Sequence, residues 1–180
     1  MLSIVVPECE LFDEKNLEFI YVKRTTLQLE HSLVSVSKWE SKWRKPFLGK
    51  QNRTFEESID YIRCMTLTQN VDPNVYLALT KENIQQVDAY INHPMTATWF
   101  SDDSSKKPGK EVITSEIIYH WMIAMQIPYE CQKWYLNRLI TLIRVCEAKN
   151  SPPKKVGMKD TIAKYKALND ARRKAWGTKG

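Results

Sequence analysis

The residues best suited to chemistry in this 180-residue chain are its three histidines. A neutral imidazole can act as a general base or bind a metal ion, and it titrates near neutral pH. The histidines are His31, His93 and His120. None of them belongs to the H-E-x-x-H pattern, which places two imidazoles on one face of a helix. A structural role is therefore the favoured interpretation for each, and we predict no metal site and no cofactor.

Two pairs of adjacent carboxylates could perform acid–base chemistry, Glu56–Glu57 and Asp102–Asp103. The first pair follows Thr54 and is predicted to lie in the first turn of a helix, where acidic side chains complement the helix dipole. The second pair lies in a Ser- and Lys-rich loop at 101–110, where solvated charges are the ordinary case. The chain also lacks glycine-rich phosphate loops and the G-x-S-x-G pattern, so we predict no catalytic residues and no enzymatic activity.

Four cysteines are spread along the chain, at Cys9, Cys64, Cys131 and Cys146. No C-x-x-C pair occurs, so the spacing favours buried free thiols over a disulfide framework or a zinc site. The N-terminus lacks the basic and apolar regions of a signal peptide, and no apolar run is long enough to span a membrane. These features predict a cytosolic protein without a membrane partner.

Aromatic and cationic residues alternate between Trp39 and Phe47, an arrangement that could stack and hold single-stranded nucleic acid. However, Trp39 and Trp43 are four residues apart and lie on the apolar stripe of a predicted helix. Packing in the core is therefore the favoured interpretation of the tryptophans. Arg44 and Lys45 are interpreted as the solvated C-terminal end of that helix.

The net charge of +6 is concentrated in the last thirty residues. Residues 151–180 contain nine Lys and Arg against two acidic residues, whereas residues 1–150 contain 18 basic and 19 acidic residues. Pro152 and Pro153 separate the two parts. We therefore predict a globular helical domain at 1–150, with an N-terminal hairpin, and a basic C-terminal helical tail at 151–180, suited to an acidic partner.

Apolar residues spaced three or four apart predict helices along most of the chain. The predicted helices begin near Leu29, Thr54, Asp72, Thr80, Thr114 and Pro128. Thr54 and Glu57 form a capping-box pattern, and the core-facing stripe of that helix is predicted to be Phe55, Ile59, Ile62 and Met65. The helix that starts at Pro128 is predicted to be the longest and to end at Asn150.

Short β-branched and aromatic runs predict strands at Leu2–Val6 and Leu17–Val22, joined as a hairpin by an acidic turn. Thr25–Leu29 extends the second strand. Two further strands, at 96–100 and 111–113, are predicted to pair with this hairpin. The predicted fold is α+β and mostly α, a small N-terminal β-sheet packed on about six helices with an additional basic C-terminal helix.

Residues 160–176 predict a basic amphipathic helix in the tail, with too little apolar area to fold alone. It is predicted either to dock on a partner or to remain a solvated terminus. The predicted partner-binding residues are Ile162, Tyr165, Leu168, Arg172, Arg173, Lys174 and Trp176. The apolar members would make the contacts, and the cations would steer them.

Two long runs resemble a known family, TLQLEHSLVSVSKWESKWRKPF at 26–47 and IDYIRCMTLTQNVDP at 59–73. The resemblance continues in PMTAT at 94–98, ITSEII at 113–118, WYLNRLITLIR at 134–144, NSPPKK at 150–155 and LNDARR at 168–173. These runs resemble small proteins from the tail gene region of long-tailed bacteriophages, labelled tail assembly chaperones. They cover nearly the whole chain but include no mechanistic motif.

The resemblance implies a non-enzymatic role in the host cell cytoplasm. A tail assembly chaperone coats the helical tape measure protein, helps to recruit tail tube subunits and leaves the finished particle. The partners implied are therefore the tape measure protein and the tail tube protein, with self-association into a homo-oligomer left open. The alternatives are a structural virion component, such as a minor tail or head–tail connector protein, and a nucleic-acid-binding protein using the basic tail. Nucleic acid is the less favoured partner.

Overall fold

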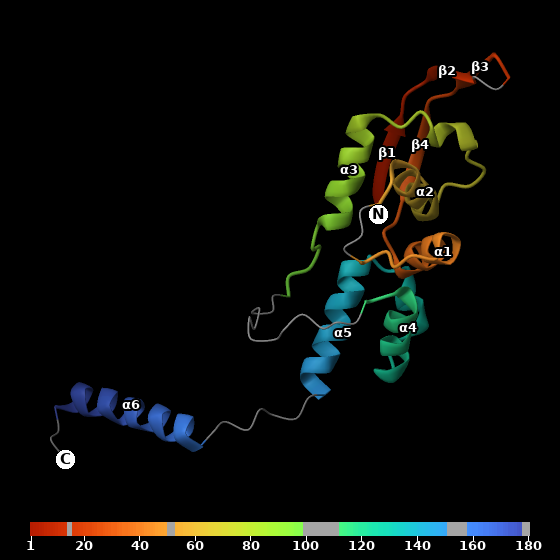
Figure 1. Ribbon diagram of the computed structural model, residues 1–180. Helices are drawn as coiled ribbons and strands as arrows, with labels where there is room; N and C mark the ends of the chain where they lie inside the picture. Colours follow the sequence, from red (N-terminus) through yellow and green to blue (C-terminus); the bar gives the residue numbers. More distant parts are fainter. Residues whose placement is uncertain (14–15, 50–52, 99–111, 151–157, 178–180) are drawn as a thin grey trace. The chain divides into compact units, whose positions relative to one another are not determined.

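The computed structural model describes residues 1–13, 16–49, 53–98, 112–150 and 158–177 (Figure 1). The chain divides into two compact units, Met1–Glu147 and Ala148–Gly180. In these ranges the fold is α+β and mostly α-helical, which confirms the predicted fold class. No helix of the described ranges is long and apolar enough to cross a membrane.

Two antiparallel strand pairs, one nested inside the other, begin the chain. β1 (Leu2–Val6) pairs with β4 (Thr25–Leu29), and β2 (Cys9–Asp13) pairs with β3 (Glu18–Val22). In Figure 1, β2 and β3 continue the ribbon that β1 and β4 begin. The predicted pairing of the first strand with the strand at 17–22 is therefore wrong.

The error arose at residues 9–13, whose acidic composition resembles a turn. In the structure these residues alternate between half-buried and exposed side chains, which is the period of a strand. Pro7 comes just before them and has no N–H to continue a ladder. It separates β1 from β2, so that a second strand pair starts there.

The pair β1–β4 buries one of its faces. Ile4 and Val6 of β1 and Leu27 and Leu29 of β4 are almost completely inaccessible, whereas their sequence neighbours are more exposed. α3 (Lys81–Asn92) lies against β1, and the Asn83 side chain donates to the Val5 carbonyl. The ribbon thus forms one wall of the core of the first unit.

Three helices begin at hydroxyl caps with a capping box. Ser32 precedes α1 (Leu33–Trp43), Thr54 precedes α2 (Phe55–Met65) and Thr80 precedes α3. At each cap the hydroxyl accepts a hydrogen bond from the backbone N–H of the third helical residue. The side chain of that residue in turn accepts from the backbone N–H of the cap residue. The predicted starts at Thr54 and Thr80 are confirmed, but α1 begins four residues after Leu29.

The apolar stripe predicted for α2 is wrong at Phe55, which is 72% exposed. The buried side chains of α2 include Tyr61, Ile62 and Met65, together with the carboxylates Glu57 and Asp60. Both carboxylates accept hydrogen bonds from α1 or the segment after it, and these bonds offset the cost of their burial.

The predicted long helix from Pro128 to Asn150 is interrupted. A 3-10 turn (η2, Tyr129–Lys133) is followed by extended Trp134, and α5 (Leu136–Asn150) starts afterwards. Tyr135 forms a bridge with Ser32, and the Leu136 amide donates to the His31 carbonyl. Pairing with the start of α1 therefore breaks the helix at a place where the apolar pattern is continuous.

The other elements of the first unit are η1 (Pro73–Tyr76), which is capped by Asp72, and α4 (Ser115–Ala124). The strands predicted at 96–100 and 111–113 are absent from the described residues 96–98 and 112–113. The rest of those two segments, and the predicted loop at 101–110 with its carboxylate pair, lie outside the described residues.

Candidate partner-binding helix

α6 (Met158–Trp176) carries the predicted partner-binding residues. It begins two residues before its predicted start and ends where predicted. Gly177 follows with φ of 63°, the left-handed conformation that commonly ends a helix. The nineteen residues span about 28 Å, which is long enough to lie along a partner over five turns.

Four apolar side chains follow one another along α6 at spacings that keep them on one side of the helix: Ile162, Tyr165, Leu168 and Trp176. Their exposed fractions range from 44% for Leu168 to 79% for Trp176. In a globular domain, a stripe of this kind usually packs on a core. In α6 it is open to solvent.

Basic residues lie beside this stripe, and one of them lies within it. Arg172 lies four residues after Leu168 and four before Trp176, so it shares their side of the helix. Arg173 and Lys174 lie in the last turn, where they suit the negative end of the helix dipole. All three side chains are exposed. With six basic and two acidic residues, α6 has a formal charge of +4.

This arrangement is suited to binding rather than to catalysis. An amphipathic helix can place its apolar stripe in a groove of a partner, while flanking cations pair with carboxylates on the rim. An isolated helix of this length is only marginally stable in water, and burial of the stripe would stabilise it. The structure thus presents the predicted residues together on one exposed helix.

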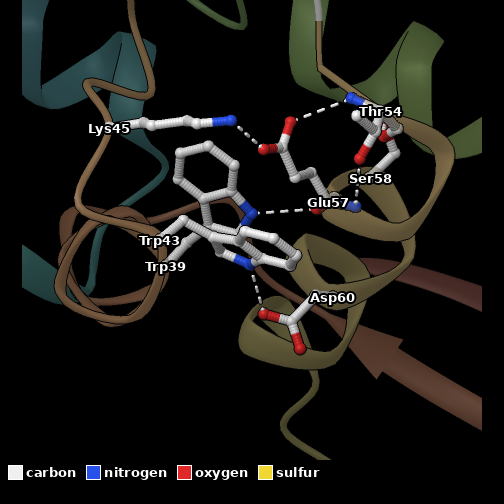
Figure 2. Close-up of polar contacts among 7 residues, drawn as sticks. All are labelled: Trp39, Trp43, Lys45, Thr54, Glu57, Ser58 and Asp60. Carbon is white, nitrogen blue, oxygen red and sulfur yellow. Dashed lines mark hydrogen bonds and ion pairs between the residues drawn. The ribbon is translucent and has the colours of Figure 1, made fainter.

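The tryptophans of α1, which could have stacked on nucleic acid, instead join α1 to α2. The Trp39 indole N–H donates to the Glu57 carbonyl at 2.8 Å, and the Trp43 indole N–H donates to the Asp60 carboxylate at 2.9 Å (Figure 2). Trp39 is only 1% exposed. The predicted packing role of the tryptophans is confirmed.

The sequence predicts that Lys45 is a solvated cation, but in the structure Lys45 forms an ion pair. Its ammonium pairs with the Glu57 carboxylate at 2.5 Å, and the same carboxylate accepts from the Thr54 amide at 2.9 Å (Figure 2). The hydrogen bond from Lys45, followed by the one from Thr54, lowers the pKa of Glu57. Glu57 is therefore held as a carboxylate that links α2 to the segment after α1.

His31 belongs to a buried polar cluster. Its Nδ1 lies 2.5 Å from the Tyr61 hydroxyl, which lies 3.3 Å from the Ser35 hydroxyl. Burial and, secondarily, the charge of Arg53 lower the pKa of His31 to about 4, and burial raises the pKa of Tyr61. The imidazole is neutral at pH 7 and closed to solvent, which agrees with a structural role.

Tyr135 has a structural role that no motif or spacing in the sequence indicates. Its hydroxyl lies 2.5 Å from the Tyr90 carbonyl and 2.6 Å from the His93 carbonyl, at the C-terminal end of α3. The side-chain amide of Asn137 also donates to the His93 carbonyl. Two side chains at the start of α5 therefore bind carbonyl groups that a helix end leaves without partners.

The remaining histidines and thiols show no shared site. His93 and His120 are exposed, and the His93 imidazole accepts from the Met95 amide. Cys131 is buried as predicted, whereas the other three cysteines are half-buried. Within the described ranges, no three His, Cys, Asp or Glu residues are grouped as metal ligands would be.

Comparisons with protein-family models, with curated proteins and with solved structures found no match for this chain. Its function is therefore inferred from α6 and from the resemblance noted in the sequence.

Proposed function

We propose that this protein binds other polypeptides through α6 and acts as a non-enzymatic phage tail assembly chaperone in the host cytoplasm. The observation that carries the binding function is the exposed stripe of α6, which contains two aromatic side chains and is bordered by cations. Aromatic and arginine side chains are the residues that most often dominate the energy of protein–protein binding.

The choice of partners rests on the resemblance to tail assembly chaperones. A tape measure protein offers long helices, and the stripe of α6 has the dimensions to pack beside one of them. Recruitment of the tail tube protein would then use another part of the chain. Release from the finished particle requires reversible binding, which suits a single short helix whose ordering lowers its net affinity.

A pull-down with the tape measure protein tests this proposal. The full-length variant Ile162→Ala/Tyr165→Ala/Leu168→Ala should lose at least tenfold in affinity, since each truncation removes exposed apolar area that binding would bury. The matched control, Ala167→Gln/Ala171→Gln, changes the opposite side of α6 and should bind normally. Equal binding by all three proteins would remove α6 from the mechanism.

Mass spectrometry of purified virions separates the chaperone from the structural alternative. A chaperone should be missing from finished particles and present in extracts of infected cells, whereas a minor tail or connector protein stays in the particle.

The exposed cations and the aromatic side chains of α6 also favour one alternative, nonspecific nucleic-acid binding. Its signature is a steep linear fall of log affinity with log salt concentration. We expect only weak binding to random DNA at physiological salt. Tight, salt-sensitive binding that Arg172→Gln/Arg173→Gln weakens would favour the nucleic-acid function instead.

A further inference from the structure

The hairpin β2–β3 exposes an aromatic face that the core does not use. Phe12 lies directly across from Phe19, with ring centroids 5.1 Å apart, and Tyr21 lies on the same face across from Glu10. These aromatic side chains are 52% to 72% exposed. On the opposite face, Val22 is buried in the core of the first unit.

Leu17, just before β3, adds to this exposed apolar surface. It is 75% exposed and has a φ of 54°, a left-handed conformation that a leucine adopts only at a steric cost. Large apolar side chains that are exposed near one another, as the Phe12 and Phe19 rings are, are typical of an interaction surface. We refer to Phe12, Leu17, Phe19 and Tyr21 as the hairpin face.

Carboxylates surround the hairpin face. Residues 8–18 contain five acidic residues and one lysine, and Glu8, Glu10 and Glu18 are exposed. The Glu8 carboxylate accepts from the Tyr21 hydroxyl at 3.1 Å, so the negative charge lies directly against the aromatic surface. A matching partner would present apolar side chains together with cations.

α6 has the chemistry that this surface requires, namely an exposed apolar stripe with two aromatic side chains and a formal charge of +4. We propose that the hairpin face of one copy of this protein binds α6 of a second copy. Apolar contact between the stripe and the rings would provide the attraction. Arg172, Arg173 and Lys174 would pair with the carboxylates around the hairpin.

Tyr21 also borders a hollow that could receive a large side chain. This cavity of about 320 Å³ lies beside β3 and is lined in part by Val71, Asp72 and Val75. An aromatic residue with a neighbouring cation, such as Trp176 with Arg173 three residues before it, has both the apolar surface and the charge to match it.

The two surfaces differ from each other, so their contact is heterologous and head-to-tail. After the first contact the pair of copies retains one free hairpin face and one free α6, so association continues as the concentration rises. This self-association goes beyond the proposed function, because it requires no second kind of polypeptide.

Sedimentation velocity on the full-length protein tests the proposal. Over about 1 to 200 µM at low salt, the average mass should rise steadily beyond a dimer. At about 1 M salt the association should weaken strongly, because charges across the interface are screened. A monomer at every concentration, as expected if α6 folds back on its own chain, would overturn the proposal.

Two full-length variants provide a sharper test. The hairpin variant Phe12→Ser/Phe19→Ser and the tail variant Arg172→Glu/Arg173→Glu/Lys174→Glu should each remain monomeric. Mixed together, they should form a 1:1 heterodimer and nothing larger, since one variant retains α6 and the other retains the hairpin face. The control Ala167→Gln/Ala171→Gln should associate like the unchanged protein.

Other arrangements give different results in the same experiment. If the tail variant still dimerises, the interface joins two hairpins, and if the hairpin variant still dimerises, it joins two tails. Either result, or a mixture that stays monomeric, contradicts the proposal. A second hairpin variant, Glu10→Lys/Glu18→Lys, keeps both rings and should also prevent association. Circular dichroism confirms that each variant is folded.

Discussion

At the scale of single residues, the main chemistry of the described chain is the burial of groups that could titrate. His31 and Tyr61 are buried against each other, and Glu57 is buried against Lys45. Each of these polar groups has a hydrogen-bond partner, and the bonds hold specific elements together. A change in their protonation should therefore change the free energy of unfolding as the pH changes.

The first prediction concerns His31, whose pKa is lowered to about 4 in the folded protein. An unfolded histidine titrates near pH 6.5, so the unfolded chain binds a proton first as pH falls. The stabilisation is fully present above about pH 6.5 and is lost progressively between that pH and about 4. We expect a loss of about 2 kcal/mol between pH 7.5 and 5.

Urea unfolding at pH 7.5, 6 and 5 measures this dependence. The variant His31→Gln should show a much flatter profile, because it has no imidazole to protonate. His120→Gln, which changes an exposed histidine, is the control and should keep the steep profile. A wild-type profile that stays flat down to pH 5 would contradict the prediction.

At the scale of elements, side-chain hydrogen bonds decide which helices meet. Trp39 and Trp43 of α1 form hydrogen bonds to α2, and Tyr135, at the start of α5, forms a hydrogen bond to the end of α3. The second link also explains why the helix predicted from Pro128 is broken. A continuous helix through Tyr135 would lose the bridge to Ser32.

The second prediction is that Tyr135→Phe lowers the free energy of unfolding by about 1 to 2 kcal/mol. The substitution removes a hydroxyl, and the carbonyl groups at the end of α3 then lose their hydrogen-bond donor. Urea unfolding at pH 7 measures the change. Hydrogen exchange should also show faster opening of the last turn of α3. Tyr129→Phe removes a hydroxyl from an exposed tyrosine and should change the stability by less than about 0.5 kcal/mol.

At the scale of the whole molecule, the chain combines a folded unit that has its own core with a helix that has none. Buried apolar residues from the strands and from α1 to α5 form one cluster within the first unit. In α6, by contrast, Ile162, Tyr165, Leu168 and Trp176 all remain exposed. The buried core of the first unit and the exposed stripe of α6 therefore belong to different parts of the sequence.

The third prediction follows from this separation. Deletion of residues 151–180 should leave the Tm of the remaining chain within about 2 °C of the full-length value, because the described side chains of α6 bury no core surface. Differential scanning calorimetry of dilute protein measures both values. A fall of more than about 5 °C would show that the tail supports the fold.

Most local starts and stops could be predicted from the sequence because their causes are local. A capping box at Thr54 requires only residues three positions apart, and a proline excludes a helix wherever it stands in the interior. The stripe of α6 was predictable for the same reason. Pairing between distant segments could not be predicted in this way. Residues 9–13, for example, contain no local signal that identifies the strand with which they pair.

The sequence by itself determined the mostly helical class, the separation of a near-neutral body from a basic tail, and the spacing of the stripe in α6. These properties depend on composition and on neighbours within a few residues. Only the tertiary structure decided the nested strand pairing, the break before α5, the burial of Glu57 and Asp60, and the exposure of the hairpin face. Each of these depends on contacts between residues far apart in the chain, where packing and hydrogen bonding override local preference.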